Sequence, residues 1–173
     1  MATKLVKKGY GQLELNQASF RRSGRIEAQC KIAEGIEYIE SGMLLAVNNI
    51  DRTVGYAKDN VGHPVALHYS TEHMYDERAN ALKDFKLDAN SFLPRMGYLS
   101  AGDKYTTNTV AYDESKWATE DLFIAALGTK PLYAHAGEDG YHLVNETATN
   151  AIAMAVAATT MPDGQRAVKF VAL

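Results

Sequence analysis

The sequence predicts a mainly β protein, a β-sandwich or barrel-like body built from hairpins and accompanied by one or two short helices. Three observations support this fold class. Short segments alternate apolar and polar residues, as half-buried strands do. Glycine and proline lie between these segments, where tight turns require them. The chain has 173 residues, 46% of them hydrophobic, so it can bury a core without a metal or a disulfide.

The first 25 residues are predicted to form a basic extended arm with a hairpin, distinct from a single β-rich body over residues 26–173. Residues 12–20 begin with an alternating pattern, residues 21–24 form a turn, and residues 25–32 alternate again. The arm has six basic side chains and one acid, a net charge of +5, which leaves −8 on the body. This contrast favours contact between the arm and an acidic surface or a phosphate, although solvated flanks of a turn would have the same charges.

The next strands are predicted over residues 43–48, 53–58 and 64–69. The first is a compact apolar run, and residues 49–52 turn the chain toward the second. Pro64 begins the third strand, where its missing N–H donor is harmless.

Two helices are expected after these strands. The first starts at Ser70 or Thr71 and places Met74, Arg78, Leu82 and Phe85 along one face. The second spans Glu114–Leu127, with Gly128 as its C-terminal stop and Pro131 just beyond. Trp117 is expected to pack from this helix against the sheet.

The remaining chain predicts two hairpins. Residues 132–136 and 141–145 flank a turn that begins and ends with glycine. Alternating residues from 152 onward lead into Met161–Gly164, a type I turn with a bulge, and residues 167–173 return. The alanines near residue 150 could also form a helix, because alanine has the best helix propensity. The matched turn and return strand favour the hairpin.

No residue pattern predicts catalysis, so a non-enzymatic role with no cofactor and no metal is expected. The chain has neither a phosphate-binding glycine loop nor a nucleophile elbow. His63, His68 and His73 are spaced five apart, which does not force them to converge as zinc ligands. Cys30 lies in an alternating apolar run and is expected to be a buried core side chain.

The composition of the chain argues against two classes of partner, nucleic acids and membranes. A sequence pI near 5.9 argues against a dedicated nucleic-acid binder, whose domain pI usually exceeds about 9. The sequence has no apolar run of the ~20 residues that a membrane span needs. One cysteine allows no intrachain disulfide, which is typical of a reducing compartment.

Three segments resemble the head-decoration, or capsid-cement, proteins of tailed bacteriophages. They are KLVKKGYGQLELNQASF, LPRMGYLSAGDKYTTNTVAYD and TTMPDGQRAVKFVAL. The resemblance lies in short, polar-tipped strands rich in alanine, threonine, asparagine and glycine. It implies a β-rich body on the outer capsid of the virion, made in the host cytoplasm, often as a homotrimer that binds the major capsid protein.

The resemblance and the charge pattern together predict a capsid interface on the arm. An extended basic segment can add a strand to an exposed sheet edge, where main-chain hydrogen bonds provide affinity. The alternatives are a tail or head–tail connector component, a small enzyme with a dispersed site, and a cellular binding module. The residues predicted to contact the capsid are Lys7, Lys8, Tyr10, Arg21, Arg22 and Arg25.

Overall fold

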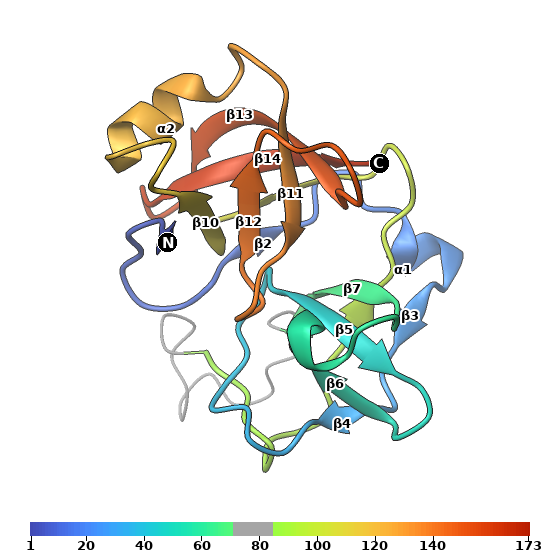
Figure 1. Cartoon of the computed structure of the whole chain (residues 1–173). Coiled ribbons are helices and arrows are strands. Elements are labelled where there is room, and N and C mark those ends of the chain that lie inside the picture. The colour runs from blue at the N-terminus through green and yellow to red at the C-terminus, as the bar shows by residue number, and fades with distance from the viewer. Residues whose placement is uncertain (71–84) are drawn as a thin grey trace.

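The computed structural model describes residues 1–70 and 85–173. Within these ranges the chain forms two mixed β-sheets, two short α-helices and one 3-10 turn, η1 (Ala57–Asp59). Figure 1 shows the eight-stranded sheet, sheet A, and helix α2 (Glu120–Ala126) in the upper half of the molecule. The six-stranded sheet, sheet B, is in the lower half. The predicted mainly β fold is confirmed. The helix predicted from Ser70 or Thr71 lies almost wholly outside the described residues.

Sheet A has eight strands and combines both ends of the sequence. All its pairings are antiparallel except that of β10 with β12. In spatial order the strands are β1 (Ala2–Lys4), β10 (Val110–Asp113), β12 (His142–Asn145), β11 (Leu132–Ala136), β13 (Ala153–Thr160), β14 (Arg166–Ala172), β9 (Lys104–Thr107) and β2 (Leu13–Glu14).

Sheet B has six strands from the first hundred residues. Its only parallel pairing among the described strands joins β4 to β6. In spatial order the strands are β3 (Ile26–Glu27), β8 (Met96–Gly97), β7 (Val65–His68), β5 (Leu44–Asn48), β6 (Thr53–Gly55) and β4 (Lys31–Ile32).

Sheet B separates two hydrophobic cores. Leu44 and Leu67 face the core that fills the inner side of sheet A, whereas Leu45 and Val47 face a second core with Cys30. Strand β5 is therefore buried on both faces, which explains why its sequence is continuously apolar rather than alternating. Cys30 is buried as predicted.

The two C-terminal hairpins form as predicted. Strands β11 and β12 pair across the turn at residues 137–140, and β13 pairs with β14 across residues 161–165. Ala153 and Ala155 are buried in the core of sheet A. The alanine-rich segment is thus a strand, because it pairs with β11 on one side and with β14 on the other.

Helix α2 is shorter than predicted. The segment from residue 114 instead forms a turn held by Asp113, whose carboxylate accepts from the Ser115 amide at 2.9 Å and from its hydroxyl at 2.6 Å. The helix starts after Thr119, whose hydroxyl accepts from the Leu122 amide. Trp117 is 5% exposed and packs edge-on against Phe123.

The predicted N-terminal hairpin is wrong. Strand β2 pairs with β9, β3 pairs with β8, and residues 20–23 form helix α1 (Phe20–Ser23). The reason is Phe20, which is 0% exposed and packs against Tyr69 with ring centroids 5.0 Å apart. Burying this ring stabilises the fold by roughly 2–3 kcal/mol, and a free hairpin would leave it in water.

Candidate functional site

A group of buried polar side chains lies where the chain passes from β1 to β2. We call residues 5–12 the strap. It begins at Leu5, which is buried and whose amide donates to the Val110 carbonyl at 2.9 Å. The next amide, that of Val6, donates to the Glu120 carboxylate at the start of α2, at 3.0 Å. The strap is therefore attached to the body and not extended into solvent.

Three buried polar residues, at the end of β9 and in the turn before β10, hold the end of the strap. The Asn108 side chain accepts from the Gln12 amide at 2.6 Å, and the Thr107 hydroxyl donates to the Gln12 carbonyl at 2.7 Å. Asn108 also donates to the Tyr10 carbonyl at 3.4 Å, and Thr109 contacts Thr107 through its hydroxyl at 2.8 Å. These bonds satisfy backbone groups that have no strand partner on this side.

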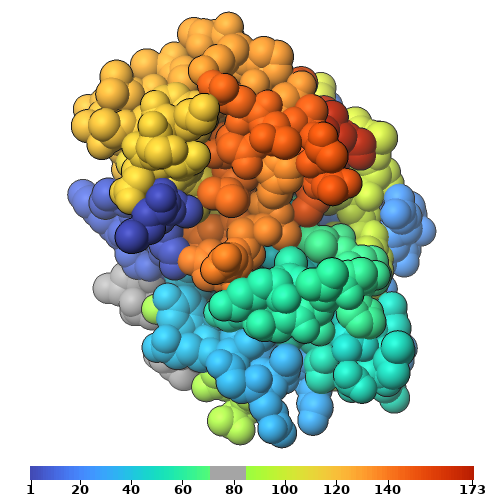
Figure 2. Space-filling model, viewed as in Figure 1, coloured from blue at the N-terminus to red at the C-terminus, as the bar shows by residue number. Residues whose placement is uncertain are grey.

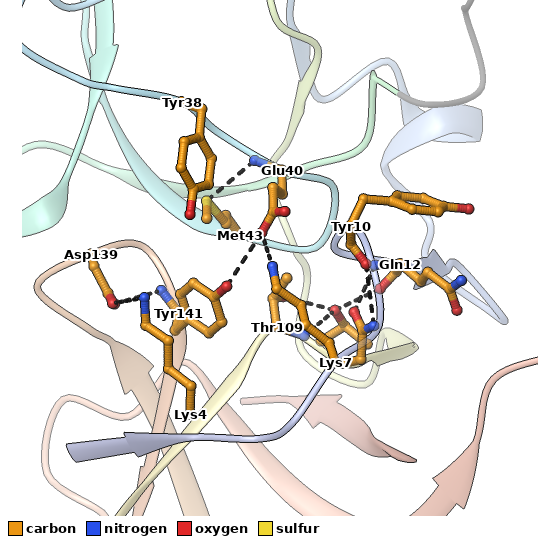
Figure 3. Close-up of polar contacts among 12 residues, drawn as sticks. Lys4, Lys7, Tyr10, Gln12, Tyr38, Glu40, Met43, Thr109, Asp139 and Tyr141 are labelled. Carbon is orange, nitrogen blue, oxygen red and sulfur yellow. Dashed lines mark hydrogen bonds and ion pairs between the residues drawn. The ribbon is translucent and has the colours of Figure 1, made fainter. Parts of the chain in front are cut away.

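Glu40 is the centre of the site. Its side chain is 0% exposed, and its Oε2 atom is in contact with the Lys7 ammonium and accepts from the Tyr141 hydroxyl at 3.2 Å. Its other oxygen, Oε1, has no hydrogen-bond partner among the described residues. Figure 3 shows Lys7 reaching Glu40 from the strap and Tyr141 reaching it from the turn just before β12. A buried carboxylate with one unsatisfied oxygen is costly, by about 1–3 kcal/mol or more.

Burial dominates the electrostatics of this cluster. Desolvation lowers the pKa of Lys7, against the opposing effect of the Glu40 carboxylate. Desolvation likewise raises the pKa of Tyr141, and the charge of Glu40 raises it further. Lys4 extends the cluster toward the surface, since its ammonium lies 2.7 Å from Asp139 and 4.1 Å from the centre of the Tyr141 ring.

His68 is a further buried titratable group near Glu40. Its Nδ1 atom donates to the Glu40 carbonyl at 2.7 Å, so the neutral ring accepts at Nε2 from the Ser70 hydroxyl, also at 2.7 Å. Burial lowers the pKa of His68 to about 4. A serine beside a neutral histidine resembles a nucleophile and its base, but both residues are 0% exposed. The pair holds the Glu40 carbonyl within the fold.

His142 has a similar role in sheet A. Its Nδ1 atom donates to the Thr109 carbonyl at 3.1 Å, and its Nε2 atom accepts from the Tyr105 hydroxyl at 3.0 Å. The ring stacks on Phe170 with centroids 4.8 Å apart. Burial lowers its pKa to about 3, so the ring is neutral at physiological pH.

The structure divides the six predicted interface residues into two groups. Lys7 points inward to Glu40, Tyr10 is half-buried, and Lys8 is exposed beside them. Arg21, Arg22 and Arg25 lie on α1 or just after it and are exposed. Figure 2 shows the first residues, in dark blue, at one edge of the molecule and the lighter blue of α1 at the opposite edge.

Sequence reasoning missed Glu40 and Tyr141. Glu40 lies in residues 33–42, where glutamates recur at every third position, and no local pattern distinguishes it from Glu34 or Glu37. Its partner Lys7 is 33 residues away in sequence. The only available signal was the excess of lysine before a segment of alternating apolar residues.

No metal site occurs in the described part of the chain. Groups of three or more histidine, cysteine, aspartate or glutamate side chains are absent from it. His68 is buried and His63 is half-buried, and His73 lies outside the described residues. A surface cavity of about 500 Å³ lies beside β1, lined by Lys4, Lys58 and the turn at residues 137–139.

Comparison with protein-family models, with curated proteins and with solved structures finds no match to this chain. In the described ranges, no helix is both long enough and apolar enough to cross a lipid bilayer.

Proposed function

We propose that this chain is a non-enzymatic structural protein of a tailed-phage virion that binds the outer capsid surface and stabilises the shell. The observation that supports it best is the exposed basic cluster of Arg21, Arg22 and Arg25, which we call the α1 cluster. The partner in this proposal is the major capsid protein, and the chain acts as a homo-oligomer, with a trimer favoured.

The α1 cluster has the chemistry of a protein-binding surface. Arginine guanidinium groups bind carboxylates through two parallel hydrogen bonds and keep their charge at all physiological pH values. Arg25 is already oriented, because its guanidinium donates to the Ser100 hydroxyl. Two of the three arginines lie in the last turn of α1, where the helix dipole favours positive charge.

The interior supports a binding role over a chemical one. His68 and His142 each use both ring nitrogens in hydrogen bonds within the fold. Their burial suits a rigid body whose surface, rather than an internal pocket, makes the contacts. Repetition of a modest contact over a symmetric shell then produces high avidity.

The proposal is tested by binding to capsids of the encoding phage that lack this protein. Replacing Arg21, Arg22 and Arg25 with alanine is expected to weaken attachment at least tenfold, and added salt should weaken the native attachment. The matched control replaces three other exposed basic residues with alanine, namely Lys31, Lys58 and Lys116. It therefore changes the net charge by the same amount. Equal loss with both triple variants would mean that only total charge matters and would exclude the α1 cluster.

Copy number separates the proposal from its nearest alternative. A cement protein should be roughly stoichiometric with the major capsid protein in purified particles, whereas a tail or connector component should be present in far fewer copies. Absence from purified particles would overturn both assignments.

A further inference from the structure

We propose that Lys7 and Glu40 form a covalent cross-link, in which the lysine amine and the glutamate carboxyl condense to an amide bond. The bond would tie the strap to the segment that precedes β5. It would be made by the chain itself after folding, and it is independent of the proposed role in a virion.

The geometry places the two reacting groups together and away from water. The Nζ atom of Lys7 contacts Oε2 of Glu40, and the side chains are 15% and 0% exposed. The strap also packs closely against the base of the Glu40 side chain, because a Cβ atom on Gly11 would lie 2.9 Å from Cβ of Glu40. Holding two reactants in contact removes much of the entropic cost of their encounter.

The surroundings favour the neutral amine that the reaction needs. Burial favours the uncharged amine of Lys7, which is the nucleophile. The hydroxyl of Tyr141 donates to the same Oε2 that contacts the amine, so it stands where a proton is required on the departing oxygen.

The condensation balances without an external reagent. One proton passes from the ammonium to Oε2, and the neutral amine attacks Cδ of Glu40. A second proton follows to Oε2, the Cδ–Oε2 bond breaks, and water leaves. The amide retains one N–H and the Oε1 atom as its carbonyl oxygen, and Tyr141 ends as a phenol.

The product removes a cost that the ion pair imposes on the fold. Two buried charges become one neutral amide, and the unpartnered Oε1 changes from a carboxylate oxygen to a carbonyl oxygen. An unsatisfied neutral group costs much less to bury than an unsatisfied charged one. The interior of the protein therefore drives the reaction toward loss of water.

The chain contains its own control pair. Lys130 and Glu146 are also in contact, but their side chains are 46% and 43% exposed. Water solvates both of these charges and opposes condensation, so this pair should remain an ordinary ion pair.

The test is the mass of the native, purified and then denatured chain. We expect it to be lighter than its sequence by one water molecule, and a tryptic digest should contain one branched peptide that joins the Lys7 and Glu40 segments. Peptide mapping is needed because Asp139 and Asp163 each precede glycine and such sites can also lose water by cyclisation. The Lys7→Met variant should have its full mass, and peptides containing Lys130 and Glu146 should be unlinked.

A native chain of full mass overturns the proposal, as does a water loss located anywhere except between Lys7 and Glu40. Because the native chain supplies the deciding measurement, the result does not depend on whether Lys7→Met folds.

Discussion

Gly42 illustrates how one residue constrains the interior. It has φ +87°, a conformation that favours glycine, and it lies against the Thr107 hydroxyl that holds the strap. A side chain there would meet both a strained backbone and an occupied space.

We therefore expect Gly42→Ala to lower the free energy of unfolding by about 2–5 kcal/mol, from backbone strain and overpacking together. Its Cβ would lie 2.1 Å from Oγ1 of Thr107. Gly62 is the matched control, since its φ is +85° and no described atom lies within 4 Å of the added Cβ. Gly62→Ala should cost only about 1–2 kcal/mol. Urea unfolding of the two variants measures the difference, and equal losses would show that packing at Gly42 is unimportant.

The buried histidines predict a loss of stability in mild acid. The pKa of His68 is about 4 and that of His142 about 3 in the folded chain, against about 6.5 when unfolded. Below pH 6.5 the unfolded chain binds protons that the folded chain does not, so stability falls as the pH drops from 6.5 toward 4. For His68 alone, the full difference in pKa between the unfolded and folded chain lowers the free energy of unfolding by roughly 3 kcal/mol.

The measurement is the free energy of unfolding between pH 7.5 and 4. His142→Gln should reduce the slope of the free energy of unfolding with pH. The control is His135→Gln, at a half-buried ring on the surface of sheet A, which leaves both buried histidines and their effect on stability in place. A free energy that is constant over this range would contradict the proton linkage.

At the level of elements, the strap depends on hydrogen bonds from side chains rather than from a neighbouring strand. Asn108 alone satisfies the Gln12 amide and contacts the Tyr10 carbonyl. Asn108→Ala leaves both part-buried groups without that partner and should cost about 1–3 kcal/mol.

Hydrogen exchange measures where this loss appears. The Gln12 amide should exchange faster in Asn108→Ala, while amides of the β13–β14 hairpin remain protected unless the whole chain opens. Asn90→Ala, at an exposed position, is the control. Uniformly faster exchange across both sheets would indicate global destabilisation and not local release of the strap.

The elements that sequence reasoning predicted well are those with local partners. Strands β11 and β12 and strands β13 and β14 are joined by short turns, so alternation and turn residues are sufficient to place them. The N-terminal hairpin failed because Leu13 pairs with Thr107 and Ile26 pairs with Gly97, far along the chain. Alternating residues predict that a strand exists but do not select its partner.

The candidate site was harder to predict for the same physical reason. Glu40, Lys7 and Tyr141 come from three distant segments and meet only when the two sheets are assembled. Their residue types are ordinary, and only the fold makes one of them a buried carboxylate. The exposed arginines of α1 were predictable, because surface charge follows directly from sequence.

At the scale of the whole molecule, the N-terminal residues are part of sheet A and of the core on its inner side. Residues 2–24 contribute two strands of sheet A and the buried side chains of Leu5 and Phe20. Removing a large buried side chain typically costs about 2–5 kcal/mol, out of a total stability of about 5–15 kcal/mol. We expect deletion of residues 2–24 to abolish cooperative thermal unfolding, as measured by circular dichroism.

Deletion of residues 2–4 is the matched control, because it removes only the edge strand β1. This shorter deletion should lower the midpoint of unfolding by a few degrees and preserve cooperativity. A cooperative transition near the native temperature after the longer deletion would mean that the first 24 residues are dispensable for folding.

The pairing of β1 with residues 111–113 also has a consequence for synthesis on the ribosome. The first strand is made early, yet its partner emerges more than a hundred residues later, and β2 waits almost as long for β9. At about 5–20 residues per second, the leading lysines stay unpaired for on the order of ten seconds. Throughout that interval the nascent chain presents a basic, strand-forming segment to chaperones and to other newly made polypeptides.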